Sequence, residues 1–299
     1  MKARASQQRG AALLLAMLTV VLVATLASAA LWTQWRAFEI ERAERQRAQA
    51  AWILNGALDW ARLILREDAR GNQNSGNADH LGEPWALPLE EARLSSFLAA
   101  DRNNNAEGML EAFLSGDMTD LQSRLNVGNL VRASGSGANT KVDVSEPDLL
   151  AFQRLFDQLG LPRTELDAAV KELLDSTRLA LEDPQPSRTA LLPTKLSHLA
   201  WLGISRSSLA RLEPHVTVLP QRSVLNLNTA SAEAMAAAVP GLDLASARRL
   251  VTTRERQPFN TLAEARQALP AGTPPLSDAH HGVRSQFFEV RGRLRLDDV

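Results

Sequence analysis

The stretch that decides the fold is residues 11–31, AALLLAMLTVVLVATLASAAL, which lies in a run of 26 residues without a charge between Arg9 and Arg36. As an α-helix with a rise of about 1.5 Å per residue, the stretch reaches about 31 Å, the thickness of a bilayer's hydrocarbon core. Basic residues precede it, and Trp32 and Trp35 follow it. This arrangement keeps the N-terminus cytoplasmic and places the indoles at the far interface. We therefore predict one membrane span, with the rest of the chain exported.

The same helix is predicted to continue well beyond the membrane. Residues 33–69 contain no proline and a single glycine, Gly56, so no strong stop signal interrupts them. Small and apolar residues recur there at spacings of three, four or seven, which places them on one helical face. We predict that this face is covered partly by the chain's own sheet and partly by partner subunits; its members are Ala43, Ala50, Leu54, Ala57, Ala61 and Leu65.

A cleaved secretory signal peptide is the alternative to a retained helix. Such a peptide also has a basic start and an apolar middle, and Ala27-Ser28-Ala29 matches the small residues of its cleavage site. The helical pattern, however, runs straight through this site and on to about residue 69. An uninterrupted pattern favours a helix that stays on the mature protein.

The composition excludes several classes of protein. There are 33 Lys and Arg against 34 Asp and Glu, which gives a net charge of −1 and argues against a protein that coats nucleic acid. The absence of cysteine excludes disulfides, thiolate metal sites and a cysteine nucleophile. The five histidines form no H-E-x-x-H pattern, and no G-x-S-x-G pattern occurs. We therefore predict no catalytic residues and no enzyme.

The region after the long helix changes its pattern three times. Short alternating stretches at residues 125–127 and 142–144 predict strands. Helix-start signals at Ser145 and Pro147 then open a helical block that runs to about residue 270. Alternation returns at residues 286–296, QFFEVRGRLRL. The order helix, sheet, helices, sheet predicts an α+β fold in which a helical domain is inserted into a small antiparallel sheet.

The helical block contains a weak internal repeat. Six residues between Leu196 and Leu212 match six between Ala234 and Leu250 at a constant offset of 38, and Gly203 corresponds to Gly241. Each copy is predicted to form a helix, a tight glycine turn and a second helix. Thr261 and Glu264 form a capping-box pattern that opens a last helix.

The N-terminus resembles that of type IV pilins and their relatives. In those proteins a prepilin peptidase removes a basic leader that ends in glycine, which here implies cleavage between Gly10 and Ala11. Most pilins carry glutamate at the fifth mature position, where this chain has Leu15. Lack of that glutamate, the segment Asn226 to Ala230 (NLNTA) and the segment Pro258 to Leu262 (PFNTL) resemble the K-class minor pseudopilins of type II secretion (GspK).

The resemblance implies a pilin-like long N-terminal helix, a small antiparallel sheet and an inserted all-α domain of the SAM-like or helix-hairpin-helix-like kind. The implied division is a leader at 1–10, a membrane part of the helix at 11–31, its periplasmic part at 32–70, the first part of the body at 71–144, an insert of two hairpin-like units at 145–280, and return strands at 281–299.

The resemblance also implies a role and partners. A K-class subunit initiates and caps the pseudopilus at its tip, for export of folded proteins across the outer membrane. The implied partners are the I-, J- and H-class minor pseudopilins, the major pseudopilin, the prepilin peptidase and the inner-membrane assembly platform. The implied location is the inner membrane, crossed once, with the N-terminus cytoplasmic, the body periplasmic and the subunit incorporated in the pseudopilus.

No cofactor is predicted, although relatives hold calcium in an acidic loop of the insert. The corresponding region here contains Asp175, Glu182 and Asp183 but is interrupted by Arg178, so the acidic loop is lost. A second stretch, with Asp101, Asn103 and Asn105, begins like an EF-hand loop but has Ala106 and Ala112 where that loop needs glycine and glutamate. These six residues are the metal candidates.

A membrane-anchored DNA-binding protein, similar to competence receptors, is the rival function. A DNA-binding hairpin offers backbone N–H groups to phosphate from a turn with two glycines. Here the turn is Pro240-Gly241-Leu242-Asp243, and Asp243 replaces the second glycine. We therefore expect no nucleic-acid binding.

Overall fold

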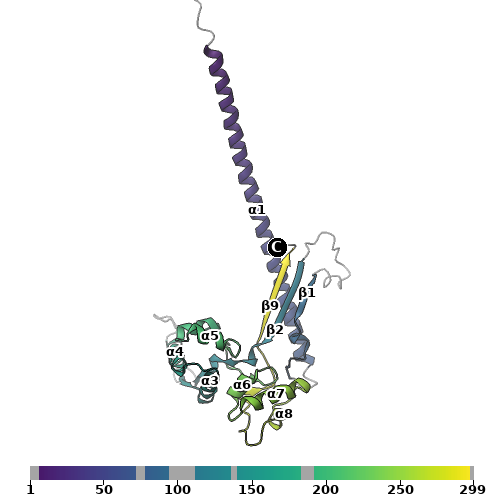
Figure 1. Ribbon diagram of the computed structural model, residues 1–299, viewed down its shortest axis with the longest axis vertical. Coiled ribbons are helices and arrows are strands. Elements are labelled where there is room, and N and C mark those ends of the chain that lie inside the picture. The colour runs from purple at the N-terminus through teal and green to yellow at the C-terminus, as the bar shows by residue number, and fades with distance from the viewer. Residues whose placement is uncertain (1–6, 72–77, 94–111, 136–139, 183–191, 297–299) are drawn as a thin grey trace, which may run out of the picture.

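The computed structural model describes residues 7–71, 78–93, 112–135, 140–182 and 192–296. Its first element is a single helix of 65 residues, α1 (Gln7–Gly71), as the uninterrupted pattern predicts. Figure 1 shows that α1 projects alone from the rest of the molecule and meets the body only along its C-terminal part. The helix is therefore divided into a free apolar half and a half that packs on the body.

A three-stranded antiparallel sheet packs against the lower part of α1, in the order β1-β2-β9. Its strands are β1 (Leu89–Arg93), β2 (Ala112–Asp120) and β9 (Phe288–Leu296). β2 and β9 pair from Ala112↔Leu296 to Asp120↔Phe288. At Gly116 a Cβ atom would lie 2.6 Å from the carbonyl oxygen of Arg291, so only glycine allows this close approach. The predicted strand at 286–296 is confirmed.

The pairing of β2 with β9 defines the insert, because these neighbouring strands are separated by residues 121–287 in the sequence. The strands predicted at 125–127 and 142–144 exist, but they do not belong to the body sheet. β3 (Leu125–Asn126) pairs with β6 (Val216–Thr217), and β5 (Lys141–Val144) pairs with β4 (Val131–Ser134). The segment that β2 and β9 enclose therefore runs from about residue 121 to about 287, and the insert predicted at 145–280 lies inside it.

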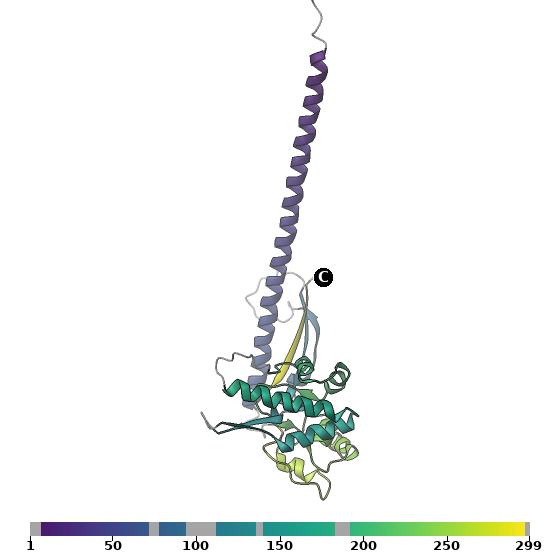
Figure 2. The ribbon, with the colours of Figure 1, turned by 90° about the vertical axis from the view of Figure 1, so that its left-hand side faces the viewer.

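The insert contains two helical units, which Figures 1 and 2 place around the end of α1 that is far from the N-terminus. The first unit comprises α3 (Glu146–Gln158), α4 (Arg163–Glu182), η5 (Leu196–Leu202) and α5 (Arg206–Leu212). The second comprises α6 (Ala232–Ala238), α7 (Leu244–Arg256) and α8 (Leu262–Gln267), and β7 (Leu225–Asn226) and β8 (His281–Gly282) pair beside it. Short 3-10 turns complete the chain: η1 (Pro84–Ala86), η2 (Leu121–Ser123) and η3 (Val127–Leu130).

Both units share one apolar core, and the repeat is visible in their turns. Leu155, Phe156 and Leu166 of the first unit and Met235, Ala237 and Ala247 of the second are at most 2% exposed. Gly203 and Gly241 have φ values of +94° and +75°, a conformation that favours glycine at the end of a helix. The predicted helix before Gly203 is a 3-10 helix, whereas its counterpart in the second unit, α6, is an α-helix.

Candidate functional site

The apolar half of α1 is uncovered on every side within the described chain. Its large side chains from Leu13 to Leu31 are 58–69% exposed, and Leu15 is 67% exposed. The hydroxyl groups of Thr19, Thr25 and Ser28 donate to helix carbonyls three or four residues earlier, so their polarity is satisfied inside the helix. By length and composition this helix is able to cross a membrane. Gly10 and Ala11 lie in its first turns, and residues 1–6 are outside the described residues.

The predicted partner face of α1 turns mostly toward the chain's own body. Ala61 is 2% exposed, and Ala50, Leu54, Ala57 and Leu65 are half-buried. A Cβ atom on Gly292 of β9 would lie 3.4 Å from Leu54, which shows how closely the strand and helix pack. Ala61 is therefore covered by this chain rather than by a partner. Ala43 lies above this packing and is exposed.

The opposite side of α1 carries exposed residues that the sequence pattern did not single out. Trp52 is 78% exposed and Leu63 is 50% exposed. They are eleven residues apart, which is close to three helical turns, so they lie on one side. Gly56 lies between them with no atom within 4 Å of the position of a Cβ atom. We call Trp52, Gly56 and Leu63 the outer face of α1. In the sequence, the signal for this outer face is a pair of large apolar residues on the same side of a helix as a glycine.

A buried polar network joins the insert to the body, and we call Asp79, Asp120, Asn226, Thr229 and Ser285 the clasp. Asn226 Nδ2 donates to Asp120 Oδ2 at 3.1 Å and to the backbone oxygen of Asp79 at 3.1 Å. Thr229 and Ser285 donate their hydroxyls to Asp120 Oδ2 at 2.5 and 2.6 Å. Asp120 is 2% exposed and Asn226 is fully buried. The Asn and Thr of NLNTA therefore fasten the two parts of the molecule together.

Asn228, the second asparagine of NLNTA, connects this motif to the PFNTL segment. Asn228 Nδ2 donates to the backbone oxygen of Phe259, and the backbone N–H of Phe259 donates to Asn228 Oδ1, both at 2.9 Å. Phe259 belongs to the PFNTL segment, and its side chain is 6% exposed. The NLNTA and PFNTL segments are thus two sides of one internal contact, which is structural rather than ligand-binding.

The glycine turn of the second unit leads into a helix that its own aspartate caps. Asp243 caps α7, and its Oδ1 accepts the backbone N–H of Ser246 at 2.7 Å. This hydrogen bond lowers the pKa of Asp243, which therefore stays charged. In the first unit Ser205, at the same repeat position, caps α5 in the same way. One backbone N–H at the start of α7 is thus already bonded to a carboxylate of the chain itself.

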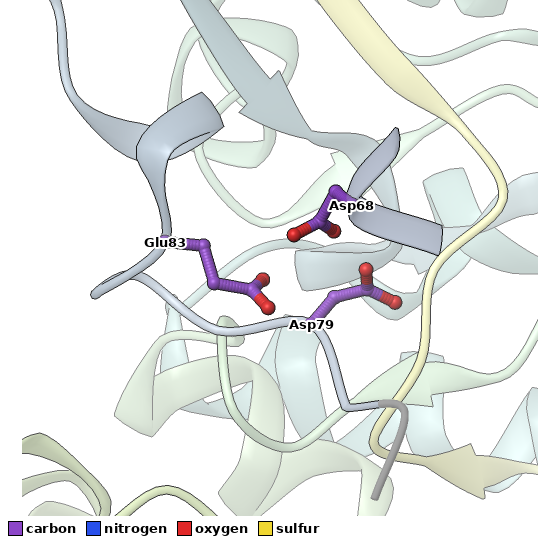
Figure 3. A group of neighbouring side chains, drawn as sticks. All are labelled: Asp68, Asp79 and Glu83. Atoms are coloured by element: carbon purple, nitrogen blue, oxygen red, sulfur yellow. The ribbon is translucent and has the colours of Figure 1, made fainter. Parts of the chain in front are cut away.

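The predicted metal residues are not brought together within the described chain. Asp175 is exposed on α4, and Glu182 is the last residue of that helix. Asp101, Asn103, Asn105 and Asp183 lie outside the described residues. The group of carboxylates that does converge is a different one: oxygen atoms of Asp68, Asp79 and Glu83 lie within 4.8 Å of one another (Figure 3). Of the six metal candidates, the structure thus describes only Asp175 and Glu182, and neither belongs to this group of carboxylates.

N–H donors already hold this carboxylate group. Glu83 Oε2 accepts from Trp85 Nε1 at 2.7 Å and from the backbone N–H of His80 at 2.9 Å, and Asp79 Oδ2 accepts from the backbone N–H of Ser285 at 2.6 Å. Burial, and then the negative charges of Glu83, Asp68 and Asp120, raise the pKa of Asp79 to about 7 against the opposing hydrogen bond from Ser285. The junction between α1, η1 and β9 is thus a site of proton binding.

We predict a pH-dependent stability from this carboxyl group. Asp79 keeps its proton up to about pH 7 in the folded chain but loses it near 3.8 in the unfolded chain. Its contribution is therefore complete below the lower value and is lost as the pH rises toward 7. Between pH 5 and 7 it should reduce the free energy of unfolding by up to about 1.4 kcal/mol per pH unit. Denaturation of the full chain in detergent against Asp79→Asn, which mimics the protonated form, measures this slope; equal slopes in the two proteins would contradict the prediction.

Two family models described as type II secretion system protein K match residues 123–221 and 225–284, together more than half of the chain. Both ranges lie inside the insert. The type II secretion system protein K of Pseudomonas aeruginosa is 26% identical over 97% of this chain and 86% of its own length. The protein of the same name from Pectobacterium carotovorum is 27% identical over 98% of this chain and 90% of its own length.

A solved structure has the same fold. It is a chain in the crystal structure of the GspK-GspI-GspJ complex of the type 2 secretion system of enterotoxigenic Escherichia coli. The TM-score is 0.52 at 15% identity, over 86% of this chain and 90% of the other. The likeness confirms a mixed architecture with a long N-terminal helix, small sheets and several helices.

Proposed function

The chain belongs to the protein K family of type II secretion systems and is a minor pseudopilin, and we propose that it starts and caps the pseudopilus at its tip. The observation that carries the proposal is the shape of α1: an apolar half that the described chain leaves uncovered, followed by an outer face with exposed Trp52 and Leu63. Such a surface is stable in a membrane and, outside it, against other subunits. The work that this surface supports is therefore assembly through the packing of subunits.

We propose the I- and J-class minor pseudopilins as direct partners, because the structural relative was solved in a complex of the three classes. The outer face of α1 is the contact that the geometry favours. Gly56 in its centre allows the backbone of a neighbouring helix to approach closely, and Trp52 and Leu63 provide apolar area on both sides. The H-class and major pseudopilins, the prepilin peptidase and the assembly platform complete the proposed partners, at the inner membrane.

Co-purification tests the proposal directly. The full chain, solubilised in detergent and carrying a tag at its C-terminus, should retain the I- and J-class proteins expressed with it. A membrane protein of similar size with an unrelated single span serves as the control for trapping in micelles. Failure to retain either protein, from a chain that is folded and inserted in the membrane, would overturn the assembly role.

We predict that the mature protein begins at Ala11. A prepilin peptidase acts at the cytoplasmic end of the membrane helix, so removal of the leader leaves the whole span of α1 in place. Sequencing of the N-terminus of the protein isolated from membranes checks this. A mature start at Ala30 would instead indicate a secretory signal peptide and exclude a pilin-like anchor.

Leu15→Glu is predicted to change the position of the subunit without preventing membrane insertion. Leu15 is exposed near the start of the span, and a carboxylate there is unfavourable unless a neighbouring subunit compensates it. In pilin-like filaments the N-terminal amine of the preceding subunit is thought to do so, and a subunit at the tip has no predecessor. The variant should therefore be incorporated within the filament rather than only at its end. Unchanged secretion and unchanged recovery of the tip complex would argue against Leu15 as the determinant.

DNA binding is the less favoured function, since Asp243 places a carboxylate at the start of α7 and accepts the backbone N–H of Ser246 there. A titration of binding to duplex DNA against salt separates the two functions, because contacts to several phosphates make the affinity fall steeply with salt. We expect no salt-sensitive binding by this chain.

A further inference from the structure

A cavity of about 400 Å³ lies within the insert where its two helical units meet. Its walls come from residues 124–129, the start of α3, Ser223 and Leu225, the end of α6 and the loop at 275–281. This volume is in the range of sites for small ligands. The cavity is far along the chain from the outer face of α1 and takes no part in the proposed assembly contact.

Internal hydrogen bonds hold the polar part of the cavity in place. Asp148, 9% exposed, accepts from Arg222 at 2.7 Å and from the Ser145 hydroxyl at 2.5 Å, and His280 Nδ1 lies 3.5 Å from its other oxygen. Asn129 is held by the backbone of Ser223 through both ends of its amide, at 2.8 and 3.1 Å. The carboxylate of Asp148 is thus already neutralised, and the wall is rigid before any ligand arrives.

The cavity has more hydrogen-bond donors to offer than acceptors. Arg124 lines it, is half-buried, and makes no hydrogen bond or ion pair through its guanidinium to any residue that the structure describes. Arg154 donates from Nε to Ala237 O at 2.6 Å and from Nη2 to Ala238 O at 3.3 Å, which leaves Nη1 available. The carboxylate that remains at the rim, Glu146, is exposed. Half-buried guanidinium groups without an acid partner favour the binding of an anionic ligand in the cavity.

The remaining walls are apolar and fix the other half of the ligand. Leu125, Ala151 and Leu225 are buried in the lining, and Leu150 is 43% exposed at the mouth. We propose that this cavity binds a carboxylate group attached to an apolar body, with the carboxylate at Arg124 and Arg154 and the apolar part between α3 and Leu225. Such a group belongs either to the C-terminus of a peptide chain or to a small aliphatic acid.

Binding to the full chain in detergent micelles tests the proposal with three probes. These are the peptide acetyl-Ala-Ala-Leu with a free carboxylate, the same peptide as its amide, and octanoate, each titrated while binding is followed by calorimetry. Saturable binding of the free acid, at least about tenfold tighter than that of the amide, is the expected result for a charge-assisted contact. The peptide acid alone would identify a chain terminus as the source of the carboxylate, and octanoate alone would identify a small acid; both support the site.

Two variants locate the binding. Arg124→Gln removes the unpaired guanidinium, and Leu150→Trp fills the mouth from an exposed position without disturbing the core. Each should weaken binding of the tighter probe at least about tenfold, whereas Arg132→Gln, an exposed arginine on β4, should leave it unchanged. No saturable binding by any probe, equal binding of acid and amide, or binding that neither variant reduces would overturn the proposal. Because the assay contains no partner subunit, its failure does not bear on the assembly role.

Discussion

Asn226→Ala is expected to reduce the free energy of unfolding by about 3 kcal/mol, the largest loss of stability that we predict for a single side chain outside the apolar core. The amide of Asn226 is fully buried, donates to Asp120, Asp79 and Ser285, and accepts the backbone N–H of Asn228 at 2.9 Å. Its removal leaves Asp120, at 2% exposure, short of a donor in a place that water does not reach. A buried carboxylate that loses a hydrogen bond is costly to the folded state.

The matched control for this variant is Asn260→Ala. Asn260 is exposed, and its side chain makes one long hydrogen bond, to Glu264 at 3.4 Å. Chemical denaturation of the two variants and the parent, as full chains in detergent, should show a loss of less than about 0.5 kcal/mol for the control. A loss for Asn226→Ala no larger than that of the control would show that the clasp contributes little.

The identity of the side chain at 226 offers a second readout. Asn226→Asp keeps the size of the residue but places a third carboxylate beside Asp79 and Asp120. We expect this variant to be partly rescued as the pH falls, since protonation removes the repulsion. Asn226→Ala should show no such rescue.

Gly56→Leu is expected to abolish assembly with the I- and J-class proteins while leaving the fold intact. Gly56 has open space around the position of a Cβ atom, so a larger side chain meets nothing in this chain. Replacing an exposed glycine in a helix even stabilises the helix, by about 1 kcal/mol. The same side chain separates two helices that pack closely at this point, and recovery of the partners should fall at least about tenfold.

Gly56→Ala is the control that separates helix stability from steric exclusion. It provides nearly the same gain in helix propensity with a much smaller side chain. Co-purification should therefore be close to normal for Gly56→Ala and lost for Gly56→Leu. Recovery of both partners at the normal level with leucine at position 56 would exclude the outer face of α1 as the contact.

The sequence predicted the elements whose signals are local. The absence of charge between Arg9 and Arg36 and the lack of proline up to Gly71 are enough to predict one long helix, because membrane insertion and helix continuity depend on neighbouring residues. The glycine turns of the repeat are also local, and Gly203 and Gly241 indeed have positive φ. The cleavage after Gly10 and the role of Leu15 remain predictions.

Which strands belong to the body and which to the insert depends on contacts between distant segments. The sequence alone was not sufficient to predict this division. β3 and β5 have the alternation of strands, but alternation does not reveal which strand is the neighbour. The partner of β2 lies beyond the whole insert, in β9. The predicted start of the insert at residue 145 therefore lies inside the segment that β2 and β9 enclose.

By itself, the sequence determined a helix that is long and apolar enough to cross a membrane and that continues into the body, and it showed motifs that resemble those of one secretion family. Only the tertiary structure decided what the residues of those motifs do. Asn226 and Asn228 of NLNTA bond to residues far away in the chain, at Asp120 and Phe259, and the two sides of α1 differ because a sheet covers one of them. The physical reason is that burial and hydrogen-bond partners depend on which distant segments meet, whereas helix formation and membrane insertion depend mainly on adjacent residues.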